Sequence, residues 1–162
     1  MSERDRAFDG SPRNRRPRDE LGRPLPYGSV GVPTTPDDLA LSPSAALQRA
    51  DALLQSGRPF HAHEILELQW KACPAEQRAL WQALAQWAVA ITHHARGNPT
   101  GARSVLNRAS NTLATHQGPV PAGLDLTAVL AWCREALAAE PASSDADATW
   151  PPLPALWRAS TN

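Results

Sequence analysis

"WQALAQWAVAITHHARGNPTGARSVLNRA", residues 81–109, contains two helical patterns that are separated by a clear stop. Alanine, leucine and glutamine dominate residues 75–96 and favour one long helix, which Gly97 ends. Asn98 is then a good N-cap with a proline directly after it, so the next helix is expected over residues 99–116. A loop this short favours two helices that lie side by side and antiparallel.

Similar signals predict helices on both sides of this pair. Ser42 is an N-cap before an apolar repeat at helical spacing, and that helix should end near Gly57. A second helix is expected over residues 59–72, and a last one over residues 126–140 with Asp125 as its cap. Strand signals are absent. The predicted fold class is therefore all-α, a single compact bundle of about five antiparallel helices.

Two proline-containing segments flank this predicted helical domain, residues 42–140. Residues 1–41 hold six of the sixteen prolines, scattered arginines and few large apolar side chains, so a disordered tail is expected, with its last part laid over the domain. In residues 141–162 the stretch "WPPLPALW" carries two tryptophans that are costly to leave in water. We expect this segment to be extended and to pack back on the bundle; the alternative is a docking peptide for an aromatic-lined groove in a partner.

Charge and composition exclude several classes of protein. Sixteen lysines and arginines balance sixteen aspartates and glutamates, which gives no reason to expect a nucleic-acid partner. No apolar run is long enough for a membrane span, and the N-terminus lacks a secretory signal, so no membrane partner and a cytoplasmic location are expected. Cys73 and Cys133 form no metal-binding motif and are expected to be reduced.

"FHAHEILELQW", residues 60–70, places charged groups among apolar ones on one helix. At about 100° per residue, one face holds two aromatics, a histidine and two acids: Phe60, His63, Glu64, Glu67 and Trp70. His63 and Glu67 lie one turn apart, the spacing that two helix-borne ligands of one metal ion require. His61 points away from this face and is expected at the rim.

The long helix of residues 75–96 carries a matching polar stripe. Gln82, Gln86 and His93 fall within about 40° of one another, and His94 follows directly. If this helix packs antiparallel to the preceding one, Gln82 lies close to Glu67 and Gln86 close to His63, with His93 beyond them. The sequence therefore predicts one polar constellation between the two helices.

This constellation has two interpretations. In the first, His63 and Glu67 bind a divalent metal (zinc, manganese or iron) together with His93 or His94, and Glu64 is the catalytic base of a metal-dependent hydrolase. "HEILE" resembles the HExxH helix of zinc peptidases, with Glu67 in place of the last histidine. In the second, the same groups form a buried hydrogen-bond network of histidine, glutamate and glutamine in a non-catalytic binding or scaffold protein.

"RPFHAHEILELQW" and residues 81–109 resemble the domain-of-unknown-function family 309 over about residues 58–109. Its pattern is an aromatic followed by E-A-H-E-x-x-E-x-x-W, then Q-G-x-x-Q-x-A-x-A-x-x-H and R-G-N-x-x-G-A. The matching residues are a polar set and a turn: His63, Glu64, Glu67, Trp70, Gln82, Gln86 and His93 with His94 beside it, then Gly97, Asn98 and Gly101. His61 stands where the family has a glutamate, and Ala83 where it has a glycine. The resemblance implies a small all-helical protein, in a group labelled predicted metal-dependent hydrolase.

A further alternative comes from "GNPTGARSVLNRA", which resembles the helix start of a tetratricopeptide repeat. No second copy follows at a period of about 34 residues, so a solenoid is not predicted. The resemblance leaves a small helical interaction module, with a peptide or small-molecule ligand, or a homodimer formed through one tryptophan-bearing face.

Overall fold

The computed structural model describes residues 16–139 and 149–159, and five α-helices make up most of them. Their bounds are α1 Pro43–Gln55, α2 Pro59–Ala72, α3 Arg78–Ala95, α4 Pro99–Thr115 and α5 Leu126–Ala138. A 3-10 turn, η1 (Ala75–Gln77), leads into α3. Within these described ranges there are isolated β-bridges but no strand. The predicted all-α bundle is confirmed.

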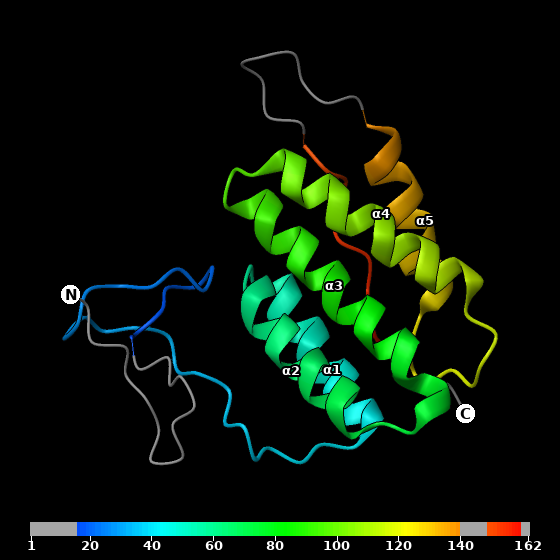
Figure 1. The fold of residues 1–162 in the computed structure, drawn as a ribbon, viewed down its shortest axis with the longest axis horizontal. Coiled ribbons are helices and arrows are strands. Elements are labelled where there is room, and N and C mark those ends of the chain that lie inside the picture. Colours follow the sequence, from blue (N-terminus) through cyan, green and yellow to red (C-terminus); the bar gives the residue numbers. More distant parts are fainter. Residues whose placement is uncertain (1–15, 140–148, 160–162) are drawn as a thin grey trace.

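Helix α3 lies in the centre of the bundle, with α2 and α4 on either side of it (Figure 1). Many of its apolar side chains are fully buried, among them Leu80, Trp81, Leu84 and Trp87. Trp87 meets Trp132 of α5 edge to face, with ring centroids 5.7 Å apart. Since burying one such side chain contributes about 1.5–3 kcal/mol, the apolar faces of α3 supply much of the driving force for folding.

The turn between α3 and α4 explains the spacing of its glycine and asparagine residues. Gly97 has a φ of 76°, a left-handed conformation that glycine adopts without steric cost. The Asn98 side chain then accepts a hydrogen bond from the Gly101 amide at 3.0 Å. A Cβ atom at position 101 would lie 2.5 Å from the Asn98 Nδ2 atom. Glycine at position 101 therefore leaves room for the capping side chain.

Residues 16–41 precede α1 and run along the outside of the bundle to its start (Figure 1). The Gln69 side chain donates a hydrogen bond to the Leu41 carbonyl at 2.8 Å. Farther back, Arg96, the C-cap residue of α3, donates two hydrogen bonds to the Leu21 carbonyl, at 2.9 and 2.6 Å. These contacts attach the segment to α2 and α3. Residues 1–15 of the predicted tail lie outside the described residues.

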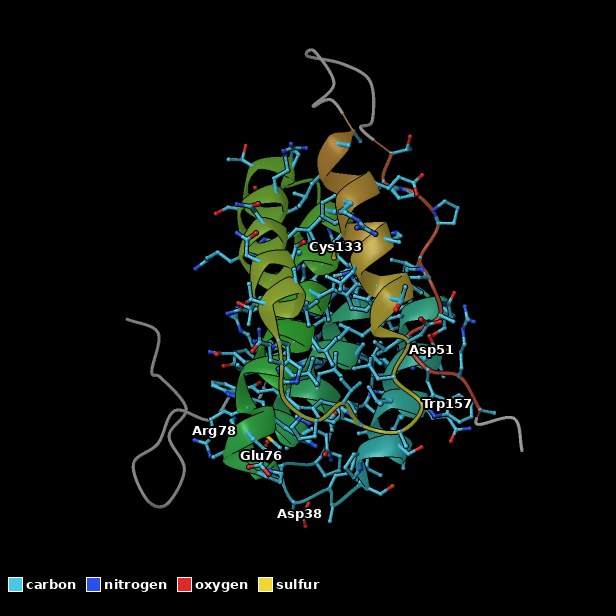
Figure 2. The ribbon with its side chains drawn as sticks, turned by 90° about the vertical axis from the view of Figure 1, so that its right-hand side faces the viewer. Asp38, Asp51, Glu76, Arg78, Cys133 and Trp157 are labelled. Atoms are coloured by element: carbon cyan, nitrogen blue, oxygen red, sulfur yellow. The ribbon has the colours of Figure 1, made fainter. Side chains whose placement is uncertain are left out.

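Residues 149–159 run beside α5 and over α1 toward Asp51 (Figure 2). Leu156 is fully buried in the core of the bundle. The Trp132 indole donates to the Pro151 carbonyl at 3.0 Å, and the Leu156 amide donates to the Asp51 carboxylate at 2.8 Å. The segment is thus held by both apolar burial and side-chain hydrogen bonds. Residues 140–148 and 160–162 of the predicted C-terminal region lie outside the described residues.

Candidate functional site

His63 and Glu67 lie one turn apart on α2, with 3.7 Å between Nε2 and Oε2. Lys71, one further turn along, approaches Glu67 more closely, with 3.0 Å between Nζ and Oε1. Burial lowers the pKa of His63, and Lys71 lowers it further, while Glu67 acts in the opposite direction. The imidazole is therefore expected to be neutral near pH 7. The closer cationic partner of Glu67 is Lys71.

Glu64 points toward residues 16–41 and lines a small depression of about 70 Å³ that Thr35 and Asp37 also line. Thr35 hydrogen-bonds to the carboxylate through both its backbone and its side chain. The Oε2 atom is buried and makes no hydrogen bond of normal geometry to a described residue. Burial raises the pKa of Glu64, while the Thr35 hydrogen bonds and Arg18 oppose that rise. The carboxylate attaches the covering segment to α2.

We expect the Glu64→Gln variant to become more stable relative to the unchanged protein as the pH rises from about 4 to 7. The raised pKa means that folding favours the protonated form, so ionisation costs stability above the ordinary pKa of a glutamate. Glutamine retains the acceptor for Thr35 and has no charge to bury. Melting temperatures measured across this pH range test the prediction. Glu135→Gln, at an exposed position, is the control and should show no such trend.

The polar groups of α3 have different partners. The His93 Nδ1 atom lies 3.2 Å from the Asn98 Nδ2 atom, in the turn that begins α4. His94 stacks on Trp150, with ring centroids 4.3 Å apart and an interplanar angle of 5°. Gln82 is exposed and Gln86 half-buried, and neither side chain hydrogen-bonds to a described residue. The structure therefore places these four residues outside any shared network with His63 and Glu67.

His61 is buried, with 2% of its surface exposed, and the prediction that it lies at the rim is wrong. Residues 18–22 cover this part of α2, where Gly22 lies against the Phe60 ring and the Arg18 guanidinium is 5.3 Å from its centroid. The Arg96 guanidinium, at the end of α3, is 5.7 Å from the same centroid. The Glu20 carbonyl lies near the imidazole. Neither ring nitrogen meets hydrogen-bond geometry with a described residue. A helical wheel of α2 alone contains no signal for this cover.

The predicted metal site would need His63, Glu67 and a histidine of α3 to converge on one position. A protein zinc site needs at least three side-chain ligands within about 2.3 Å of the ion. In the described part of the chain no three histidine, cysteine, aspartate or glutamate side chains are grouped so that they could hold an ion. His63 and Glu67 could supply two metal ligands, but His93 contacts Asn98 and His94 stacks on Trp150. The residues that the structure describes therefore do not fit a resident metal of this kind.

Fold and site together define a small all-helical protein whose polar helix face is covered by its own N-terminal segment. Residues 47–105 match the family model described as Domain of unknown function (DUF309), which confirms the resemblance to family 309. "Uncharacterized protein YpuF" of Bacillus subtilis (strain 168) is 40% identical over 68 residues, which are 41% of this chain and 39% of that protein. The chain thus spans well under half the length of this relative. No solved structure matches.

Proposed function

We propose that the protein is a non-catalytic helical binding protein in which the polar constellation has a structural role. The observation that supports it is that most of the residues expected to share one metal ion have other partners, and that only His63 and Glu67 contact each other. Glu67 pairs with Lys71, Glu64 with Thr35, His93 with Asn98 and His94 with Trp150. A hydrolytic centre would instead need these groups to converge on one reacting atom.

The same contacts have a consistent structural purpose. The contact of Glu64 with Thr35 attaches the segment before α1, and that of His94 with Trp150 attaches the segment after α5. The contact of His93 with Asn98 closes the turn between α3 and α4. Each of these polar residues therefore joins a helix to a flanking segment or loop. Such contacts hold the segments in place against the helices and so shape the clefts between them. Small ligands commonly bind in clefts of this kind.

Metal analysis of untagged protein purified without chelator tests the proposal. We expect less than about 0.1 equivalent of zinc, manganese or iron, and no rise in melting temperature when these ions are added. His63→Gln and Glu67→Gln should then leave the metal content unchanged. About one equivalent of bound metal, lost in both variants, would establish the metal-centre interpretation and refute the proposal.

Several predictions from the sequence add to this proposal. The balanced charge supports a protein without a nucleic-acid partner, and a cytoplasmic location and a homodimer remain predictions. Within residues 16–139 and 149–159, no helix has the length and apolar character needed to cross a membrane. A small-molecule or peptide ligand is part of the proposed function.

A further inference from the structure

A cavity of about 210 Å³ lies where α1, the start of α2 and residues 33–35 meet. Its lining is mostly polar or cationic and consists of Pro33, Thr34, Thr35, Arg49, Leu53, Arg58 and His61. None of these described lining residues is acidic. The cavity is separate from the depression that Glu64 and Glu67 line. Its charge therefore differs in sign from that of the neighbouring acidic face.

The two arginines of this cavity have no counter-ion within the described ranges. No ion pair joins Arg49 or Arg58 to a described carboxylate. The Nε atom of Arg58 is buried and makes no hydrogen bond there. A buried, unpaired guanidinium N–H is costly, and such groups are normally satisfied by a protein or ligand acceptor. Arg49 is exposed at the mouth, where its charge faces solvent.

His61 adds a second buried group that is not fully satisfied. The side chain is 2% exposed, and although the Glu20 backbone lies near the imidazole, neither ring nitrogen has a hydrogen bond of normal geometry to a described residue. Buried polar atoms in folded proteins nearly always have a partner, and unsatisfied ones commonly mark a place where a water molecule, an ion or a ligand binds. His61 and Arg58 belong to the same turn of α2, so two of the unsatisfied donors lie at the same cavity.

The start of α2 faces this cavity as well. Arg58 is the N-cap of this 14-residue helix and makes no side-chain capping hydrogen bond. Pro59 has no N–H, and the next amides of the first turn, those of Phe60 and His61, have no side-chain acceptor and carry the positive end of the helix dipole. Helix N-termini with free amides are common anion sites. Here the helix end, two arginines and a buried histidine surround one cavity.

We propose that this cavity binds the phosphate group of a small phosphomonoester. Two arginines match the charge of a phosphate group, which is about −1.5 to −2 at pH 7, better than that of a carboxylate. The Thr34 hydroxyl offers a further donor, whereas Thr35 already hydrogen-bonds to Glu64. Pro33 and Leu53 form an apolar wall for the group that carries the phosphate. The inference rests on the proposed binding function and specifies its ligand class.

Titration of the full chain with inorganic phosphate and with glycerol phosphate tests the inference. Calorimetry at constant ionic strength, set with sodium chloride, should show saturable binding of both, with glycerol phosphate at least as tight as inorganic phosphate. Acetate should bind at least about tenfold more weakly, because it carries one charge and fewer acceptor oxygens. Histidine ring signals in NMR spectra should shift only at His61.

Three variants and one control locate the site. Arg58→Gln and Arg49→Gln should each weaken phosphate binding about tenfold or more, since each removes a charged hydrogen-bond donor. His61→Glu, which places a carboxylate at the cavity, should abolish binding. Arg108→Gln is the control, because Arg108 is exposed on α4, away from the cavity. Arg49 is also exposed, so Arg49→Gln is expected to fold normally even if a variant at a buried position does not.

The outcomes separate this inference from the proposed function. No saturable binding up to about 50 mM phosphate, or an equal loss in Arg108→Gln, would overturn the phosphate site. Acetate that binds as tightly as phosphate would also overturn it, in favour of a carboxylate ligand. Either result leaves the proposed binding function intact, because that function depends on the metal analysis. A metal bound at His63 and Glu67 would refute the proposed function. The phosphate titration would still decide, by itself, whether the cavity binds phosphate.

Discussion

Replacing Leu156 by alanine is expected to lower the free energy of unfolding by about 2–5 kcal/mol, the usual cost of removing a buried leucine side chain. Leu156 is fully buried although it lies in an extended segment rather than a helix. Its amide donates to Asp51, and its carbonyl accepts from the Asp125 amide at 3.0 Å, so the backbone holds the side chain in place. Denaturant unfolding monitored by circular dichroism measures the change.

Leu153→Ala is the matched control for this variant, since it removes the same atoms from the same segment. Leu153 is only half-buried, so its loss should cost about 1 kcal/mol. A similar small effect in both variants would contradict the prediction, because it would mean that residues 149–159 do not pack against the bundle in solution. A large effect in Leu156→Ala alone supports the segment as part of the core.

The helices could be predicted because their signals are local. The three N-caps named from the sequence, Ser42, Asn98 and Asp125, each accept a hydrogen bond from the amide three residues on. Gly97 ends the long helix region with a positive φ, as glycine at a helix end commonly does. The largest difference is that the expected helix 75–96 starts with a 3-10 turn directly after Pro74. Nothing in these features depends on distant parts of the chain.

The candidate site could be predicted only in part, because partners across the bundle are not local. The contact of His63 with Glu67 follows from their spacing on one helix. His93 and His94 are consecutive, and the roughly 100° between them directs one toward the turn and the other toward Trp150. A helical wheel gives the angle of each side chain but not the element that meets it there.

The cover over Phe60 and His61 was the largest feature that the sequence did not reveal. It depends on residues 18–22, which are some forty positions away along the chain. Gly22 has a φ of 73° and lies against the Phe60 ring. Arg18 donates a hydrogen bond to the Gly22 carbonyl, which holds this turn in place. The proline-rich composition of the region gave no signal for such a contact, since composition reports average hydrophobicity and not a specific close approach.

Replacing Gly22 by alanine should therefore lower the free energy of unfolding by about 2–4 kcal/mol, the sum of two effects. A side chain at this positive φ costs about 1–2 kcal/mol, and the new Cβ atom would lie 2.1 Å from the Phe60 Cγ atom. The ring is flanked by Arg18 and Arg96 and has little room to move away. We expect residues 18–25 to lift from α2, and their amides to exchange hydrogen with solvent at least about tenfold faster.

Gly28→Ala separates the close contact from the backbone effect. Gly28 also has a positive φ, 86°, but a Cβ atom there would meet nothing within 4 Å. Its replacement should cost only about 1–2 kcal/mol and leave the exchange of residues 18–22 unchanged. If the two variants lost equal stability and exchanged alike, the contact of Gly22 with Phe60 would add nothing to the fold, and the cover over α2 would have to be held by other residues. A larger loss in Gly22→Ala, with faster exchange confined to residues 18–25, ties the cover to this one contact.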